Sequence, residues 1–355
     1  MDKPQTLVYQ EKSLNYTCYD AKWIPKSARF VVLGCMPRGT GVIEVFSLYG
    51  GKLESQKQIE KKASFKCGTF GAALEDRLLA TGDFDGRLSL WDLEHLSSPL
   101  YTVGAHKQII NTIDGCGGRW GHGAPEIVTG SRDGCVHVWD PRQDSGPVMS
   151  LIAPENLEKK PDCWAVAFGN SFDDSERCVA CGYDNGDLKL LDMRTRSLRW
   201  EANLRNGICS LEFDRRDIEM NKLIATTLES KFYLFDMRTQ HPQKGYANLA
   251  QKASEGTLWD VSHLPQNREL FATAGGKGSI DIWRYRYPSQ RWRVDPEDGK
   301  TEGVMGEVEH VCEQMLSSQP IHSIDWNADK LGLGVVTSFD QTVRVIIVTR
   351  LNKYE

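Results

Sequence analysis

One pattern recurs along this chain and limits its possible folds more than any other feature. Small residues are followed by a tight polar turn, and then by alternating apolar residues that end in an aromatic residue and Asp. The clearest copies span residues 80–92, 128–140 and 180–192. Weaker or degenerate copies span 225–236, 272–284, 41–46 and 338–346. Repeats of this kind cannot bury their apolar faces alone, so we expect the copies to pack against one another.

The number and spacing of the copies predict the architecture. The residues at the aromatic position are Phe46, Trp91, Trp139, Leu191, Phe235, Trp283 and Ile346. They lie 45, 48, 52, 44, 48 and 63 residues apart. The first five intervals are at or slightly above the roughly 40–45 residues of a WD repeat, which forms one blade of a propeller. We therefore predict an all-β fold, a seven-bladed WD-repeat β-propeller that occupies 1–355 as a single domain.

Each copy has a physical interpretation. The small residues suit the second strand of a blade, and Asp-Gly favours a tight hairpin because Gly tolerates positive φ. The alternating run then forms the third strand. In WD repeats a His, a Ser or Thr, an Asp and a Trp share hydrogen bonds, and the third blade has all four of them. We expect a structural network, without a catalytic role, of His106, Thr129, Asp133 and Trp139.

The ring must also close. The last blade has apolar runs for three strands, and then the chain stops. The strand-like run Thr6–Gln10 precedes the first blade's own strands. We expect this N-terminal strand to complete the last blade, which removes an open sheet edge.

The interval from Trp283 to Ile346 contains about 20 residues more than one WD repeat requires. The excess predicts a long variable loop insertion at 285–318. Its Arg and aromatic residues at 285–293 favour an outer strand of the sixth blade with snorkelling arginines. Stacking on nucleic-acid bases is the alternative. We expect the Gly- and Glu-containing segment that follows to be a mobile loop.

The sequence offers little for catalysis or metal binding. It contains no G-x-S-x-G, no H-E-x-x-H and no P-loop. Cys178 and Cys181 have C-x-x-C spacing, but residues three apart on a strand point to opposite faces. We expect no enzyme activity, no cofactor and no metal. The net charge of −5 argues against nucleic acid, and no apolar run reaches 18 residues, so we expect no membrane partner.

A binding surface is the remaining possibility. Large residues just before the turn between second and third strands, or near the start of a first strand, lie on one face of a propeller. Aromatic residues and Arg are enriched among binding hot spots, although each of these side chains could instead pack along the central channel. The candidate contact residues are Phe84, Arg132, Trp164, Tyr183, Trp259 and Phe339.

A second pattern follows three of the third strands. D-x-R occurs at 140–142, 192–194 and 236–238, and it resembles the pattern in WD-repeat substrate receptors of cullin–RING ubiquitin ligases. On that interpretation Arg142, Arg194 and Arg238 would face the ligase adaptor. The alternative is an Asp–Arg pair that fixes the turn after the third strand.

Several stretches that the repeat does not require carry a closer resemblance. They include Arg238-Thr-Gln-His-Pro242 and Leu264-Pro-Gln-Asn-Arg-Glu-Leu-Phe271, and further matches run nearly from end to end. On these residues the chain resembles the Monad family of WD-repeat proteins, which is grouped with the axonemal dynein assembly factors. The departures fall in 1–14, 50–58, 144–160 and 285–312.

The resemblance implies a cytoplasmic co-chaperone adaptor, with association with cilia left open. Its implied partners are RuvB-like AAA ATPases, their tetratricopeptide adaptor subunit, prefoldin-like subunits and axonemal dynein heavy chains. The implied function is support of dynein preassembly by a chain that is monomeric on its own. A cullin–RING substrate receptor is the alternative.

Overall fold

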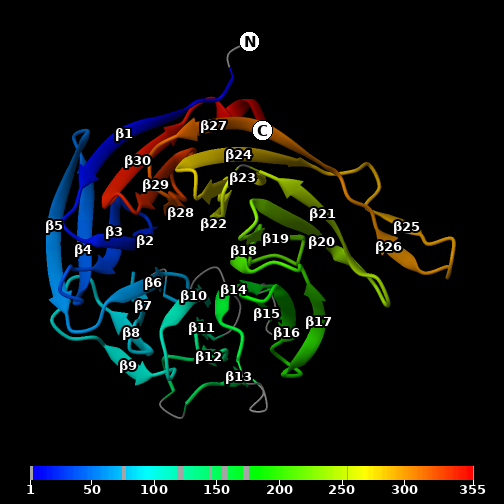
Figure 1. Cartoon of the computed structure of the whole chain (residues 1–355), viewed down its shortest axis with the longest axis horizontal. Coiled ribbons are helices and arrows are strands. Elements are labelled where there is room, and N and C mark those ends of the chain that lie inside the picture. The colour runs from blue at the N-terminus through cyan, green and yellow to red at the C-terminus, as the bar shows by residue number, and fades with distance from the viewer. Residues whose placement is uncertain are drawn as a thin grey trace.

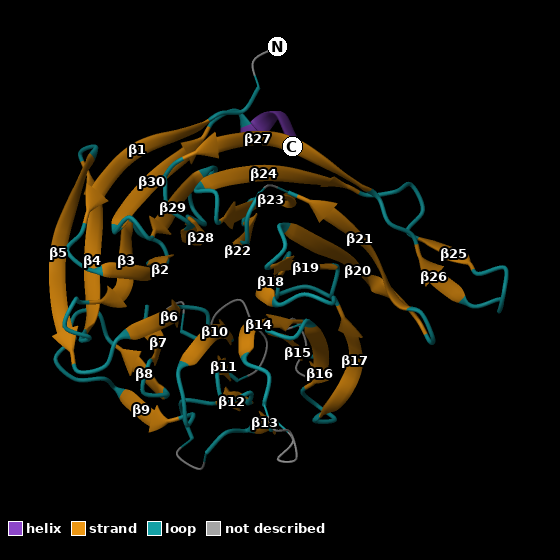
Figure 2. Cartoon of the chain, viewed as in Figure 1, coloured by secondary structure: helices purple, strands orange, loops and turns teal. Residues whose placement is uncertain are grey.

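The computed structural model describes residues 3–354, apart from 74–76, 118–123, 144–145, 154–158, 171–175 and 254. Across these residues, seven four-stranded antiparallel sheets surround a central axis, and the strands of each sheet follow one another from the centre to the rim (Figure 1). Figure 2 shows that strands and loops make up nearly all of the ring. The prediction of an all-β, seven-bladed WD-repeat propeller is confirmed.

The first four blades follow chain order, with four consecutive strands in each. Blade 1 comprises β2 (Thr17–Trp23), β3 (Arg29–Cys35), β4 (Gly41–Tyr49) and β5 (Lys52–Lys61). Blade 2 comprises β6 (Phe65–Thr69), β7 (Leu79–Asp83), β8 (Arg87–Trp91) and β9 (Tyr101–Gly104). Blade 3 comprises β10 (Ile110–Cys116), β11 (Glu126–Ser131), β12 (Val136–Trp139) and β13 (Met149–Leu151). Blade 4 comprises β14 (Cys163–Gly169), β15 (Cys178–Tyr183), β16 (Asp187–Asp192) and β17 (Ser197–Asn203).

Blade 5 also has four consecutive strands, and the departures from simple repetition fall in blades 6 and 7. Blade 5 comprises β18 (Ile208–Phe213), β19 (Lys222–Thr227), β20 (Lys231–His241) and β21 (Gly245–Lys252). Blade 6 comprises β22 (Leu258–Leu264), β23 (Asn267–Gly275), β24 (Ser279–Arg286) and β27 (Glu307–Met315). Blade 7 comprises β28 (Ile321–Trp326), β29 (Leu333–Ser338), β30 (Thr342–Val348) and β1 (Thr6–Ser13). A separate hairpin joins β25 (Trp292–Val294) to β26 (Thr301–Gly303), and a 3-10 turn spans Leu351–Tyr354.

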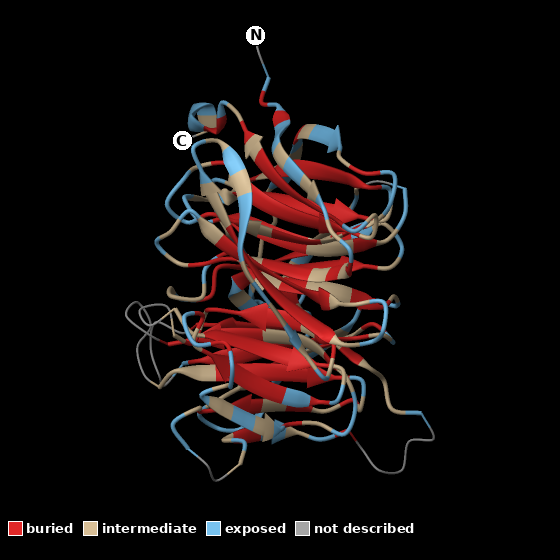
Figure 3. Cartoon of the chain, turned by 90° about the vertical axis from the view of Figure 1, so that its left-hand side faces the viewer, coloured by how far each residue is buried: buried red, intermediate tan, exposed pale blue. Residues whose placement is uncertain are grey.

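All seven signature residues lie on third strands, where each faces a second-strand partner. Trp139 lies opposite Ile127, and Trp283 opposite Phe271. The turn before the third strand requires Gly in several blades. Gly134 has φ +80°, and a Cβ on Gly86 (φ +78°) would approach the carbonyl oxygen of His106 to 2.4 Å. Apolar side chains from adjacent blades then meet in shared clusters, so the buried residues run through the body of the ring (Figure 3).

The N-terminal strand closes the ring as predicted. β1 pairs antiparallel with β30, from Thr6 opposite Val348 to Ser13 opposite Thr342. The backbone N–H of Leu14 extends this pairing by donating to the carbonyl of Gln341 at 2.7 Å. The first and last strands of the chain are therefore neighbours in the sheet of blade 7 (Figure 1).

Residues 285–318 differ from the expected outer strand and loop. The outer strand of blade 6 is β27, whereas the Arg and aromatic run ends β24 and leads into the β25–β26 hairpin, which projects from the rim (Figure 1). Buried polar contacts with blade 5 explain the difference. Arg291 binds Asp236 at 2.7 Å, and its guanidinium lies 4.8 Å from the ring centroid of Tyr287. The Tyr287 hydroxyl accepts from Asn221 at 2.6 Å.

Side chains also link neighbouring blades, which belong to separate sheets. The Asp260 carboxylate of blade 6 accepts the backbone N–H of Ile324 in blade 7 at 3.0 Å. Three equivalent bonds occur elsewhere in the ring. The N–H of Gly68 donates to Asp20 and that of Phe168 to Asp114, each at 2.9 Å. The N–H of Trp23 donates to Asp325 at 2.7 Å. Acidic residues on the first strands thus join the blades around the centre. Within the described residues, no helix is long and apolar enough to cross a membrane.

Candidate functional site

The central channel of the ring is a concave feature with a volume of about 770 Å³. First strands of all seven blades line it. Each of these strands has a β-bulge at the same position, so one residue per blade is displaced from the regular register. The seven displaced residues are Tyr19, Lys66, Asn111, Trp164, Cys209, Trp259 and His322. Bulges are commonly used to redirect side chains, and here they repeat around one end of the channel.

Aromatic rings gather at that end. His322 lies at the centre, stacked on Trp259 at 6.0 Å between ring centroids and edge-on to Phe339 at 5.3 Å. Tyr19 lies 6.1 Å from His322 and 5.5 Å from Phe84. The Lys66 ammonium lies 4.7 Å from the Tyr19 ring centroid and 2.9 Å from His322 Nε2. We call these six half-buried residues the mouth cluster: Tyr19, Lys66, Phe84, Trp259, His322 and Phe339.

The predicted contact residues divide into two groups. Phe84, Trp259 and Phe339 belong to the mouth cluster, and Trp164 lines the channel. Arg132 is 58% exposed and lies 3.7 Å from the Asp162 carboxylate.

Tyr183 does not lie on the exposed face as expected. Its side chain is only 3% exposed, because it packs into a core cluster with Cys163 and Cys181. The sequence-based prediction also missed Tyr19, Lys66 and His322. An alignment of the first strands at their shared bulge position would have identified these three residues as candidates.

Charged groups lie deeper in the channel. Lys22 Nζ is 3.0 Å from Asp20 Oδ1. Burial raises the pKa of Asp260 to about 7 and that of Asp325 to about 6. Burial alone would lower the pKa of Lys22, but the carboxylates of Asp20, Asp325 and Asp260 outweigh it and raise that pKa. These charged groups already have partners on neighbouring first strands, so we assign them to holding the blades together.

The four residues of the predicted structural network lie together. Thr129 Oγ1 is 2.8 Å from His106 Nε2 and 3.0 Å from Trp139 Nε1, and His106 Nδ1 is 3.3 Å from Asp133. Burial would raise the pKa of Asp133, but hydrogen bonds from His106 and from two backbone N–H groups hold it well below its usual range. The His106 side chain is fully buried, so this arrangement suits a structural role.

The three D-x-R arginines have different surroundings. Arg142 makes two hydrogen bonds, of 2.8 and 2.9 Å, to Asp140 of its own turn. Arg238 pairs instead with Glu219, because Arg291 of the insertion occupies Asp236. Arg194 is exposed. The arginines therefore do not repeat one geometry from blade to blade.

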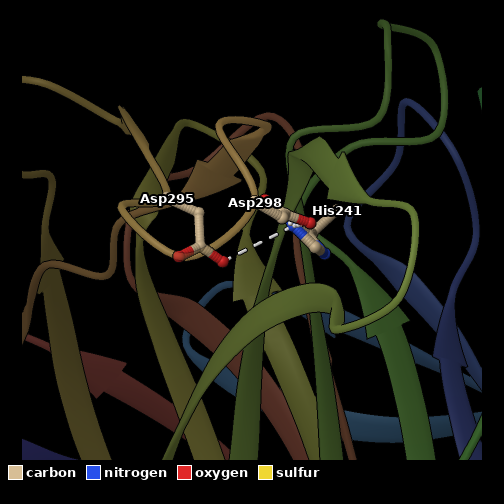
Figure 4. A group of neighbouring side chains, drawn as sticks. All are labelled: His241, Asp295 and Asp298. Carbon is tan, nitrogen blue, oxygen red and sulfur yellow. Dashed lines mark hydrogen bonds and ion pairs between the residues drawn. The ribbon is translucent and has the colours of Figure 1, made fainter.

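One group of side chains has the composition of a metal site. His241, Asp295 and Asp298 place their ligand atoms within 4.8 Å of one another (Figure 4). However, His241 Nδ1 accepts the backbone N–H groups of Gln243 and Lys244 at 3.2 and 3.0 Å. The proton of the neutral ring must then be on Nε2, the atom that faces the carboxylates, 3.1 Å from Asp298.

The charge around these side chains favours a hydrogen-bonded latch over a metal. Lys244 Nζ lies 2.6 Å from Asp295 Oδ2 and already supplies a cation there. A metal ligand imidazole normally donates from its second nitrogen, whereas His241 accepts there. The group joins the β20–β21 turn to the β25–β26 hairpin.

The C-x-x-C cysteines occupy different cores. Cys178 packs in the cluster between blades 4 and 5, and Cys181 in the cluster between blades 3 and 4. Burial raises the pKa of each thiol to about 12. Neither thiol is placed to share a ligand with the other, as the strand geometry predicts.

The blades, the Trp139–Thr129 network and the lined channel define the chain as a WD-repeat β-propeller. The WD domain, G-beta repeat family matches residues 97–140. Dynein axonemal assembly factor 10 of Homo sapiens is 57% identical over 99% of both chains, and that of Chlamydomonas reinhardtii is 51% identical over 99% of both. The Dictyostelium discoideum protein of the same name is 25% identical over 96% of this chain and 94% of its own length. The chain belongs to the dynein axonemal assembly factor 10 family.

Proposed function

We propose that this chain is a noncatalytic scaffold for axonemal dynein preassembly in the cytoplasm. It acts as a co-chaperone adaptor that links a complex of RuvB-like ATPases, a tetratricopeptide subunit and prefoldin-like subunits to dynein heavy chains. The observation that carries the proposal is full-length similarity to proteins named as dynein axonemal assembly factors, at 57% identity for the human one. Similarity over 99% of both chains extends beyond the single WD repeat at 97–140.

The architecture suits this role. A closed ring joined by β1 and β30 presents preformed surfaces, so little ordering entropy is lost when a partner binds. The mouth of the channel and the opposite face, where the D-x-R turns lie, are separate surfaces. Two partners can therefore be held at once, while ATP hydrolysis belongs to the partner complex.

Purification from cytoplasmic extract of ciliated cells tests the proposal. The tagged chain should recover RuvB-like ATPases, prefoldin-like subunits and dynein heavy chains. Cells that lack the chain should lose cytoplasmic heavy chains, and the wild-type chain should restore them. Unchanged heavy-chain levels in such cells would refute the proposed function.

The same purification addresses the ubiquitin-ligase alternative. A cullin with its adaptor, and no chaperones, would favour that alternative. Arg142→Ala combined with Arg194→Ala should then abolish adaptor binding in a folded chain. The bonding of Arg142 to its own Asp140 supports a role in the turn instead.

A further inference from the structure

Lys66 is the starting point, because its charge has an unusual environment. Its ammonium donates to His322 Nε2 at 2.9 Å and rests against the ring of Tyr19. The acceptor nitrogen requires His322 to be neutral. Burial and the nearby Lys66 charge lower the pKa of His322 well below its usual range, which agrees with this assignment. The Lys66 ammonium therefore contacts the rings of His322 and Tyr19 and not a carboxylate.

Other charged groups of the channel form ion pairs. Asp20 pairs with Lys22 at 3.0 Å, and Arg216 with Asp114 at 2.5 Å. Among the residues that the structure describes, no carboxylate forms an ion pair with Lys66. Burial lowers the Lys66 pKa, so holding the charge there is unfavourable. An anion brought to this position would relieve that cost.

The surroundings of Lys66 favour a side chain of a protein partner over a free ion. Phe84, Trp259 and Phe339 are half-buried, so each residue stays partly accessible to a partner. Aromatic side chains in such positions are typical binding hot spots. Below them the channel, at about 770 Å³, can admit a side chain. Charge and apolar surface therefore coincide at one end of the ring.

We propose that the mouth cluster binds an acidic side chain, Asp or Glu, from an extended partner segment with an aromatic residue beside the acid. Lys66 is the counter-ion, His322 and Tyr19 position its ammonium, and Trp259, Phe339 and Phe84 pack against the flanking residue. This proposal rests on the proposed scaffold function, since it identifies the chemistry by which the scaffold recognises a partner. A charge-assisted hydrogen bond of this kind is stronger where rings exclude water.

A positively charged side chain of a partner is the alternative ligand for the mouth cluster. Aromatic rings also attract alkylammonium groups, and a partner lysine could take the place that Lys66 holds against Tyr19. A lysine ligand would, however, bring a second positive charge to Lys66. The two possibilities predict opposite preferences for the same set of peptides.

Fluorine NMR of the full chain, labelled with 5-fluorotryptophan, measures the preference directly. The Trp259 signal is assigned by its loss in Trp259→Phe, and the buried Trp139 serves as a remote control. The probes are three capped peptides, Gly-Phe-Glu-Phe-Gly and its counterparts with Gln or Lys in the central position. We expect the Glu peptide to shift the Trp259 signal and to bind about tenfold more tightly than the Gln peptide, less so at high salt.

Variants at Lys66 complete the test. Lys66→Gln should abolish the preference for Glu over Gln, whereas Lys66→Arg should retain most of it. Lys107→Gln, which removes an exposed lysine before β10, should leave it unchanged. A melting curve for each variant confirms folding. Equal binding of the Glu and Gln peptides, a preference for the Lys peptide, or no shift at Trp259 with any of the three would overturn the proposal.

The scaffold function is tested separately from this site. If Lys66→Gln restores dynein heavy chains in deficient cells and no peptide shifts Trp259, the function stands and the site is wrong. If the wild-type chain fails to restore the heavy chains, the proposed scaffold function is wrong, whatever the result of the peptide titrations.

Discussion

The indole N–H of Trp139 donates to the hydroxyl of Thr129 at 3.0 Å. The hydroxyl can in turn donate to His106 Nε2, because His106 Nδ1 carries the proton that faces Asp133. The hydrogen bonds thus run in one direction, from the indole of Trp139 to the half-buried carboxylate of Asp133. Trp91 and Trp283 make the same bond to Thr81 and Thr273, at 2.8 and 2.9 Å.

Removing either end of the Trp139–Thr129 bond should lower stability. Trp139→Ala should cost about 3–5 kcal/mol, as for other large-to-small core substitutions. Thr129→Val should cost about 1–3 kcal/mol, because it leaves a buried indole N–H without an acceptor. Urea denaturation measures both. Thr102→Val, at an exposed position of β9, is the control, and equal midpoints for Trp139→Ala and wild type would refute the structural role.

His137 should make blade 3 sensitive to acid. Burial, with the neighbouring His106, lowers the His137 pKa to about 4. The folded state therefore binds this proton less readily than the unfolded state, whose His has a pKa of about 6.5. The stability that neutral His137 provides is complete above about pH 6.5 and is lost as the pH falls toward 4.

The corresponding measurement compares urea midpoints of wild type and His137→Gln between pH 7.5 and 4.5. The wild type should lose more stability than the variant over this range. The buried Asp260 and Asp325, with raised pKa values, act in the opposite direction, so the difference between the two proteins is the readout. His95→Gln, at an exposed histidine, should follow the wild type, and parallel curves for His137→Gln would contradict the prediction.

Deletion of residues 1–12 should destabilise the whole ring. The deletion removes the partner of β30 and leaves an open edge on blade 7. We expect a lower melting temperature and aggregation. Attaching residues 3–13 after Glu355 through a flexible linker should restore most of the loss, because Thr6 lies opposite Val348. A deletion variant that is fully soluble, with an unchanged melting temperature, would exclude this role of β1.

Arg291 should hold the projecting hairpin against blade 5. Arg291→Ala leaves the buried Asp236 without its cation, and we expect faster proteolysis within 287–306 while the ring stays folded. Arg293→Ala, which breaks an exposed pair with Glu302, is the matched control. Equal cleavage rates for the two variants would show that Arg291 is not the anchor.

The latch at His241 should not depend on a metal. Treatment with EDTA should leave the melting temperature unchanged, and added Zn²⁺ should not raise it, because His241 Nε2 carries a proton toward Asp298. His241→Ala should instead release the hairpin and increase its proteolysis. Tight Zn²⁺ binding by calorimetry that is lost in His241→Ala would show that the proton assignment is wrong.

The amino-acid sequence by itself determined the parts of this protein that depend on local pattern. The repeat fixed seven third strands, the Asp-Gly turns and the Trp139 network, because strand alternation and turn chemistry act over a few residues. The strand-like Thr6–Gln10 also predicted closure, since the last blade had apolar runs for only three strands.

Only the tertiary structure decided what lies at the channel mouth and at the rim. Lys66 and His322 are 256 residues apart, and the ring brings them together through equivalent bulges on two blades. Tyr183 turned inward because its neighbours in blades 3 and 4 provide an apolar core. The chain leaves blade 6 after Arg286, because Asp236 of blade 5 pairs with Arg291. Such contacts depend on which blades adjoin, and the repeat pattern carries no information about the side chains that meet there.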